Sequence, residues 1–404
     1  MEDNRFETAL TGLTPSERVI FFMLKRLKFG LLEIHLPDGR SFCFGQAIKG
    51  QDSAVINVRQ KGFFTRLLRK GSNGFAEGYM DADWDTPDLA NLLLILNKNM
   101  SELSKTIDSN KFTFLINRII HILRPNTRSG SKKNIHAHYD LGNDFYSLWL
   151  DSSMTYSSAR FSNHQMSLRE AQDEKYRRLA KSANIGPDDH VLEIGCGWGG
   201  FAEFAAKEIG CKVTGITISK EQLAYGQERI AKAGLQSKVE LKFCDYRDVR
   251  EKYDRIVSVE MFEAVGESYW PSYFSQLKNC LKPGGMIGLQ IITIANERFE
   301  SYRKSADFIQ RYIFPGGMLP SPEKLTQSFD GAGLALVDQL DFGTDYARTL
   351  KEWRHKFIEA WPKVEKMGFD ARFRNMWEYY LAYCEAGFSS KSIDVTHFTL
   401  SHND

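Results

Sequence analysis

The sequence predicts an α/β protein in which a doubly wound, mostly parallel sheet carries helices on both faces and follows a smaller N-terminal α+β domain. Two observations predict this fold class. From about residue 188, apolar runs rich in β-branched residues alternate with helical patterns, as in parallel sheets whose strands are joined by helices. The length of 404 residues, at about 150 per domain, favours two domains. The apolar runs are VLEIG, KVTGITI, VELKFC, DRIVSV and MIGLQIITI.

The N-terminal part begins with an amphipathic helix, predicted over 16–28 with Ser16 as its N-cap. The segment LLEIHLPDGRSFCFG alternates as a hairpin does around a Pro-Asp-Gly turn, and AVINVR follows as the next strand. Further helices are predicted over 88–100 and 112–123, before a polar, basic stretch typical of a linker. The predicted divisions are an N-terminal domain at 1–123, a linker at 124–134 and a second domain at 135–404.

Composition excludes several classes of protein. With 53 Lys and Arg against 51 Asp and Glu, the bulk charge favours neither nucleic acid nor lipid, and no nucleic-acid-binding module is recognised. The six cysteines lie far apart without a CxxC pair, so we expect a reduced, cytoplasmic protein and no metal site. The N-terminus opens acidic, unlike a signal peptide, and no apolar run approaches the ~20 residues of a membrane span.

A glycine-rich turn follows the first strand of the second domain. In VLEIGCGWGG, Gly195, Gly197 and Gly199 let the backbone approach a ligand closely where a strand passes into a helix. Dinucleotide folds space their glycines as GxGxxG, and a carboxylate such as Glu193 would repel pyrophosphate. That carboxylate suits a cation, for example a sulfonium with an amino acid tail. The spacing and the acid resemble the first motif of class I methyltransferases, which bind S-adenosylmethionine.

Two later segments fit the same fold. CDYRD follows the third strand, and Asp245 is placed to accept a hydrogen bond from an adenine amino group. The second strand of such folds usually ends in an acid that holds the ribose, but here it ends ITISKEQ. We therefore expect Thr217, Ser219 or Gln222 to take over that contact.

Several segments together resemble the cyclopropane-fatty-acyl-phospholipid synthase family. They are HYDLGNDFYSLWLDSSMTYSSARF, LEIGCGWGGFA, TGITISKEQ, DRIVSVEMFEAVGESYW, RYIFPGGMLPS and YCEAGF, in order between about residues 134 and 398. LEIHLPDG and GFAEGYM are similar to the extra N-terminal domain of longer bacterial members. The resemblance implies methyl transfer from S-adenosylmethionine onto a cis double bond of a phospholipid acyl chain. It implies cofactor contacts at Tyr156, Ser157, Glu193, Gly195, Cys196, Gly197, Trp198, Gly199, Thr217, Ser219, Gln222, Asp245, Tyr246 and Arg247.

The chemistry defines what the rest of the site must do. An alkene is a weak nucleophile, so the enzyme has to desolvate and align the reactants rather than activate a hydroxyl. Methyl addition leaves a carbocation, which aromatic faces stabilise without attacking it. A base must then remove a proton from the added methyl group for the ring to close. In the family that the sequence resembles, this base is a bicarbonate held by a cysteine, a glutamate, a histidine and a tyrosine.

Mapped residue by residue, the resemblance gives Glu263 as the glutamate and Tyr312 as the tyrosine. Ser158 stands at the cysteine position and Gln290 at the histidine position, so two of the four side chains differ. Both can hydrogen-bond an oxyanion, but a glutamine cannot shuttle a proton. The changes leave open whether bicarbonate binds and whether the product is a ring, a methyl branch or a methylene. Cys384, in YCEAGF, is a further catalytic candidate.

The leading hypothesis is a cyclopropane synthase that acts at the inner face of a membrane as a peripheral protein. Basic residues before the second domain would attract anionic headgroups; they are Arg66, Arg69, Lys70, Arg124, Arg128, Lys132 and Lys133. The sequence leaves the oligomeric state open, a homodimer included. The alternatives are a methyl- or methylene-forming acyl C-methyltransferase, an N-methyltransferase for a soluble amine, and a non-enzymatic lipid-binding module.

Overall fold

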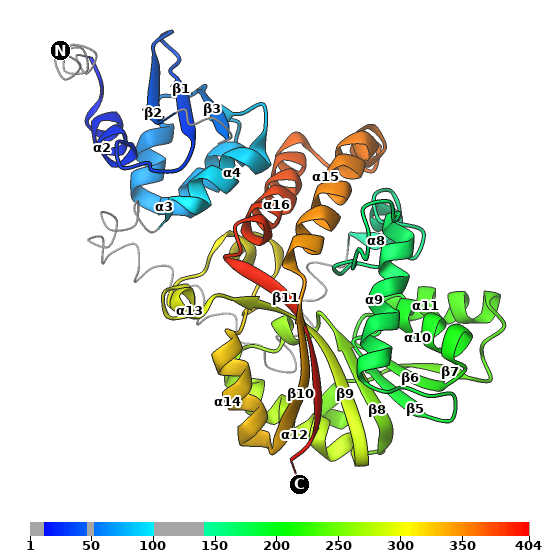
Figure 1. The fold of residues 1–404 in the computed structure, drawn as a ribbon. Helices are drawn as coiled ribbons and strands as arrows, with labels where there is room; N and C mark the ends of the chain where they lie inside the picture. The colour runs from blue at the N-terminus through cyan, green and yellow to red at the C-terminus, as the bar shows by residue number, and fades with distance from the viewer. Residues whose placement is uncertain (1–11, 47–51, 101–140, 404) are drawn as a thin grey trace.

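The computed structural model describes residues 12–46, 52–100 and 141–403, which form two sheets (Figure 1). The predicted helix at 112–123 and linker at 124–134 lie outside these residues, as do Arg124, Arg128, Lys132 and Lys133. Within the described residues, no helix combines the length and the apolar character needed to cross a bilayer.

The large sheet confirms the predicted α/β class. Its strand order is β10-β11-β9-β8-β5-β6-β7, and the five strands from β9 to β7 run parallel. β11 is antiparallel to β9, and β10 is antiparallel to β11. The bounds are β5 His190–Ile194, β6 Lys212–Thr217, β7 Val239–Phe243, β8 Tyr253–Val259, β9 Leu281–Ile294, β10 Leu334–Asp341 and β11 Ile393–His402.

Helices cover both faces of this sheet because its strands are apolar on both. In β5, Val191 packs into one hydrophobic cluster while its neighbour Leu192 packs into another. The first cluster includes α9 (Leu168–Ser182), α10 (Gly200–Phe204) and α11 (Lys220–Lys232). The second includes α12 (Trp270–Cys280) and α14 (Pro322–Ala332) on the other face. This is the doubly wound arrangement that the alternating pattern predicts.

The described residues of the N-terminal part, 12–46 and 52–100, form a four-stranded sheet in the order β2-β1-β3-β4 with three helices. The hairpin prediction is confirmed, and β3 pairs parallel to β1. The first helix begins earlier than predicted, because Thr14 rather than Ser16 is its N-cap and forms a capping box with Glu17. The bounds are α2 Pro15–Leu24, β1 Leu31–His35, β2 Ser41–Gly45, β3 Ser53–Val58, α3 Phe63–Met80, β4 Trp84–Asp85 and α4 Leu89–Lys98.

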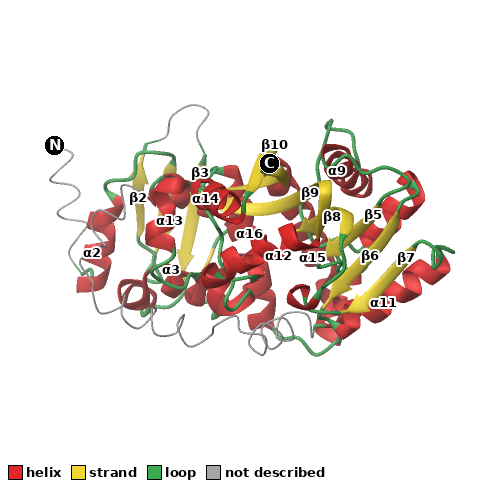
Figure 2. Ribbon diagram, turned by 90° about the horizontal axis from the view of Figure 1, so that it is seen from below, coloured by secondary structure: helices red, strands yellow, loops and turns green. Residues whose placement is uncertain are grey.

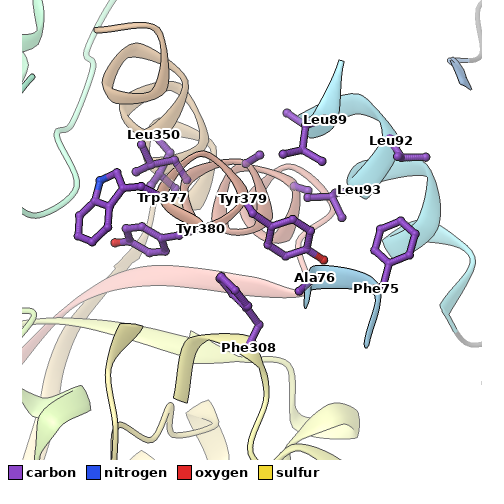
Figure 3. Close-up of a cluster of buried hydrophobic side chains, with 14 of the residues drawn as sticks. Phe75, Ala76, Leu89, Leu92, Leu93, Phe308, Leu350, Trp377, Tyr379 and Tyr380 are labelled. Atoms are coloured by element: carbon purple, nitrogen blue, oxygen red, sulfur yellow. The ribbon is translucent and has the colours of Figure 1, made fainter. Parts of the chain in front are cut away.

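Two long helices that the sequence analysis did not identify are inserted between β10 and β11. They are α15 (Gly343–Lys366) and α16 (Ala371–Ser389). Figure 2 shows α16 between the small sheet and the large one. In Figure 3, Tyr379 of α16 lies among Phe75, Leu93 and Phe308. One continuous hydrophobic cluster therefore joins the N-terminal unit to α15 and α16. Two short helices, α8 (Gly142–Ser147) and α13 (Asn296–Tyr302), complete the elements used below.

Candidate active site

A cavity of about 1100 Å³ connects the carboxyl edge of the large sheet with α16 and the N-terminal unit. Most of the predicted site residues line it, although they come from segments spread over more than 200 positions. Among the predicted residues, Gly199, Ser219, Ser158, Gln290 and Tyr312 do not line the cavity. Those that do are Tyr156, Ser157, Glu193, Gly195, Cys196, Gly197, Trp198, Thr217, Gln222, Asp245, Tyr246, Arg247, Glu263 and Cys384.

The glycine turn shapes one end of this cavity with backbone alone. Gly195 has φ +79°, and a Cβ atom there would lie 2.7 Å from Cγ of Met261. Gly199 has φ +79° as well and is the N-cap of α10. Residues other than glycine rarely adopt these φ values, so glycine at both positions allows a tight turn from strand to helix without side chains that would fill the cavity.

Glu193 provides the charge complement that a cationic ligand needs. Its side chain is buried, and one carboxylate oxygen has no hydrogen-bond partner among the described residues. Burial raises the pKa of Glu193 to about 8. A buried acceptor left unsatisfied is costly. An ammonium group above the glycine turn would donate a hydrogen bond to it. S-adenosylmethionine carries such a group as well as a sulfonium charge, so the residues fit this ligand.

The residues predicted to hold the ribose and adenine lie beside this turn, with their side chains already engaged. The Thr217 hydroxyl donates to Gln222 at 3.3 Å, and the Ser219 side chain caps α11. Asp245 accepts from the Arg247 guanidinium at 2.6 and 2.8 Å. Thr217 and Gln222 thus present polar groups to the cavity. Asp245 forms an ion pair that an adenine amino group would have to share.

Two carboxyl groups from adjacent turns, Glu260 and Glu263, line the cavity together. Glu263 accepts from the Ile292 amide at 2.5 Å, and its other oxygen is buried without a partner among the described residues. Burial, and then repulsion from Glu260, raise the pKa of Glu263 to about 8. Glu263 therefore carries a proton at neutral pH. Sequence analysis identified Glu263 and missed Glu260, although it lies only three residues earlier in the same segment.

Glu260 accepts hydrogen bonds from three groups. They are the Ser158 amide at 2.8 Å, the Gln290 side-chain amide at 2.6 Å and the Tyr346 hydroxyl at 2.6 Å. The Ser158 hydroxyl turns away and donates to the Ala159 carbonyl. Burial raises the pKa of Glu260, whereas these donors and the Lys175 ammonium act against the rise. Ser158 and Gln290, two of the predicted ligands of bicarbonate, thus lie together, and both bind the Glu260 carboxylate.

Tyr312 does not join this group, which corrects the sequence-based mapping. Its hydroxyl donates to Glu77 of α3 at 2.7 Å, so it links the large unit to the N-terminal unit. Tyr346, near the start of α15, is the tyrosine that reaches the carboxyl pair. Tyr346 belongs to the segment GTDYARTL, about 30 residues after the RYIFPGG motif. No role was predicted for this segment from the sequence.

Cys384 lines the cavity, but burial raises the pKa of its thiol far above the usual range. A thiol of this kind stays protonated and is a poor nucleophile. Around it, aromatic side chains form the cavity wall. The Tyr346 and Phe388 rings stack at 4.4 Å, and the Tyr156 and Tyr380 hydroxyls lie 2.7 Å apart. Such faces suit a transient carbocation.

Lys175 of α9 is a fully buried cation behind the site. Its ammonium donates to the Ser157 hydroxyl at 2.7 Å and to Gln172 at 2.6 Å. Burial lowers the pKa of Lys175 to about 7. Sequence analysis missed it because a lysine within a charged helix gives no sign of burial. It positions the loop that carries Ser157 and Ser158.

The other arm of the cavity is apolar and belongs to the N-terminal unit. Ile20, Met23 and Leu24 of α2 line it, together with Phe75 of α3 and Leu93 of α4. Val19 also lines the cavity and is 47% exposed, so this arm reaches the surface beside α2. A polar ligand gains nothing from such walls, whereas an alkyl chain does.

Comparison with known proteins identifies the family. The family description "Mycolic acid cyclopropane synthetase" matches residues 126–398. The tuberculostearic acid methyltransferase of Mycobacterium tuberculosis is 37% identical over 388 residues, which are 91% of this chain and 88% of that protein. The cyclopropane-fatty-acyl-phospholipid synthase of Escherichia coli strain K12 is 35% identical over 369 residues, covering 88% and 90% respectively.

A solved structure agrees with both sequence relatives. The mycolic acid cyclopropane synthase crystallised with SAH and CTAB superimposes with a TM-score of 0.63 at 28% identity. The match covers 67% of this chain and 97% of that one. The glycine turn, the buried acid beside it and the cavity between the two units agree with this grouping. The chain belongs to the mycolic acid cyclopropane synthetase family, whose members are S-adenosylmethionine-dependent methyltransferases acting on lipids.

Proposed function

We propose that the protein transfers a methyl(ene) group from S-adenosylmethionine to the cis double bond of an unsaturated phospholipid acyl chain, forming a cyclopropane ring. The observation that carries this proposal is a single cavity that joins the glycine turn, a carboxyl pair and an apolar arm open at α2. A small soluble amine needs no such arm. The names of two sequence relatives, a tuberculostearic acid methyltransferase and a cyclopropane-fatty-acyl-phospholipid synthase, agree with an acyl substrate.

In this proposal, S-adenosylmethionine supplies an electrophilic methyl group. The glycine turn and Glu193 hold the donor, and the apolar arm removes water from the alkene, so that the two reactants meet in a desolvated space. The rings of Tyr346, Tyr380 and Phe388 stabilise the positive charge left on the chain. A neighbouring carboxylate takes a proton so that the ring closes.

A second product is favoured by a specific observation. The tuberculostearic acid methyltransferase is named for a different product from that of the Escherichia coli enzyme, and it is similarly close to this chain. A methylene group arises if the cation shifts along the chain before the proton leaves. Methyl transfer to the alkene is common to both outcomes, and the proton leaves the transferred carbon in both.

The lipid enters, we propose, from a bilayer that contacts α2. Val19, Phe22 and Phe29 are 47%, 59% and 48% exposed, which is unusual for large apolar side chains. Four basic residues of the same segment are exposed as well, namely Arg18, Lys25, Arg26 and Lys28. Exposed apolar and basic side chains in one short helical segment are typical of helices that lie in a membrane surface. Arg66 and Lys70 are less suited to headgroups because they pair with Asp81 and Glu77.

The test incubates the purified protein with S-adenosylmethionine and vesicles of dioleoyl phosphatidylglycerol and dioleoyl phosphatidylethanolamine. Matched vesicles with palmitoyl chains lack the double bond. Mass spectrometry should find oleoyl chains heavier by one CH₂ unit and palmitoyl chains unchanged. Equal formation of S-adenosylhomocysteine with both vesicles, or methylation of a soluble amine with the lipids untouched, would overturn the proposal.

A further inference from the structure

The family resemblance does not identify the group that removes the proton from the transferred methyl group in this protein. A bicarbonate needs ligands, and two of its four expected side chains are changed here. One replacement, Ser158, turns its hydroxyl away from the site and offers only its backbone amide. The remaining hydrogen-bond donors all point at one carboxylate of the protein itself, the side chain of Glu260.

Three donors fix this carboxylate. One oxygen accepts from the Ser158 and Gln290 amides and the other from the Tyr346 hydroxyl. Backbone and side-chain N–H groups cannot accept, so the set is complementary to an ionised carboxylate. Ser158, Gln290 and Tyr346 are buried, whereas Glu260 is half-buried and lines the cavity. The carboxylate is therefore held from behind and open toward the substrate.

The backbone at Glu260 is held in a costly conformation. Its φ is +48°, a value that favours glycine, at the end of strand β8. Such conformations persist where the surroundings impose them, and they cluster at functional sites. Here the conformation is accompanied by the three hydrogen bonds that hold the carboxylate at the cavity.

A further layer orients the donors. The Gln290 carbonyl oxygen accepts from Nε2 of His397, 2.8 Å away on the neighbouring strand β11. Since that oxygen can only accept, the His397 ring donates from Nε2 and the Gln290 amide group must face Glu260. Burial lowers the pKa of His397 far below its usual range, so the ring stays neutral. Lys175 adds a positive charge behind the same carboxylate.

We infer that the Glu260 carboxylate is the built-in base of this enzyme and takes the place of a bound bicarbonate. The inference rests on the proposed function. The alkene π electrons form the new bond to the methyl carbon while the sulfur–carbon bond breaks and its electrons stay on sulfur. Glu260 then removes one proton from the transferred methyl group, and that C–H pair closes the ring onto the cationic carbon. The proton leaves the carboxyl group for solvent after product release.

Two substitutions at Glu260 test this assignment. Glu260→Gln keeps the shape but cannot take a proton. Glu260→Gly suits the backbone conformation and leaves a carboxylate-sized gap in front of the same three donors. Both are assayed with oleoyl phospholipid vesicles in buffer freed of carbon dioxide, with and without millimolar bicarbonate, and binding of S-adenosylhomocysteine by calorimetry verifies folding. Glu352→Gln is the matched control, because Glu352 of α15 forms a half-buried ion pair with Arg348 at 3.1 Å and does not line the cavity.

We expect native activity to be the same with and without bicarbonate. Glu260→Gln should lose about 10²–10⁴-fold in rate, the usual contribution of a general base. Glu260→Gly should be as slow without bicarbonate and regain activity when bicarbonate or formate is added. With a CD₃-labelled donor, native enzyme and Glu352→Gln should leave two deuterons on the transferred carbon. The residual product of Glu260→Gln should keep three, because the cation then loses a proton from the chain.

The inference is overturned if native activity falls when bicarbonate is removed, or if Glu260→Gln keeps its rate and its loss of one deuteron. It is also overturned if Glu260→Gly folds, binds S-adenosylhomocysteine and responds to neither anion. A failure of the proposed function is distinct, since native enzyme would then modify no acyl chain under any of these conditions.

Discussion

The two ends of the cavity are built in different ways. At the glycine turn, one continuous segment from β5 into α10 forms the wall, and its shape comes from backbone conformation at Gly195 and Gly199. At the apolar arm, the wall is assembled from side chains of α2, α3, α4 and α16, which lie up to about 360 positions apart. The donor end therefore depends on local chain geometry, whereas the acyl end depends on the packing of one unit against another.

Among the substitutions that compare the two ends of the cavity, the largest effect on ligand binding should come from adding a side chain to the turn. Gly195→Ala places a Cβ atom 2.7 Å from Met261 at φ +79°, so we expect binding of S-adenosylhomocysteine to weaken about tenfold or more. Gly234→Ala is the control, because Gly234 has φ +68° with nothing within 4 Å of the added atom. Calorimetry should show lower stability for both variants and weaker binding only for Gly195→Ala. Equal affinities in the two variants would show that the turn does not hold the donor.

The opposite end is tested on α2. Phe22→Glu removes an exposed apolar side chain and adds a negative charge, so binding to anionic oleoyl vesicles should fall about tenfold. The control is Val337→Glu on β10, where the side chain is 54% exposed but lies at the edge of the large sheet. Co-sedimentation measures the binding, and affinity for S-adenosylhomocysteine should stay unchanged. Equal losses in the two variants would remove α2 as the membrane contact.

These differences explain what could be predicted from the sequence. The α/β fold class and the glycine turn could be predicted from local patterns, because a strand, a turn and a helix follow one another within a short stretch of sequence. Glu260, Tyr346 and His397 were missed because their roles arise only when β8, α15 and β11 meet. The mapping of Tyr312 failed for the same reason, since its neighbours in the chain line the cavity while its hydroxyl bonds to Glu77. The burial of α16 against α4 is likewise set by the tertiary structure.

A smaller effect is expected on the pH dependence of S-adenosylmethionine binding at the glycine turn. Without ligand, the pKa of Glu193 is about 8, so its carboxyl group is mostly protonated near pH 7. A cationic donor favours the ionised form, and binding should release a proton and tighten several-fold as the pH rises from 6 toward 8. Calorimetry with S-adenosylmethionine in two buffers of different ionisation enthalpy counts that proton. If Glu193→Gln released it too, another group would be responsible.

The smallest effect is expected at Cys384. Because burial keeps its thiol protonated, Cys384→Ser should change the rate of product formation by no more than about twofold. Mass spectrometry of intact protein during turnover should detect no acyl or methyl adduct. A loss of activity as large as that of Glu260→Gln, in a variant that still binds S-adenosylhomocysteine, would make Cys384 part of the chemistry instead.

The most direct test of the whole account follows the atoms of the transferred group. Native protein is incubated with CD₃-labelled S-adenosylmethionine and oleoyl phospholipid vesicles, and the acyl chains are analysed by mass spectrometry and proton NMR. We predict chains that gain one CD₂ unit and lose their alkene protons, since the donor end supplies the methyl group and the acyl end presents the double bond. Lipids without deuterium, alongside a soluble amine that acquires CD₃, would contradict the account.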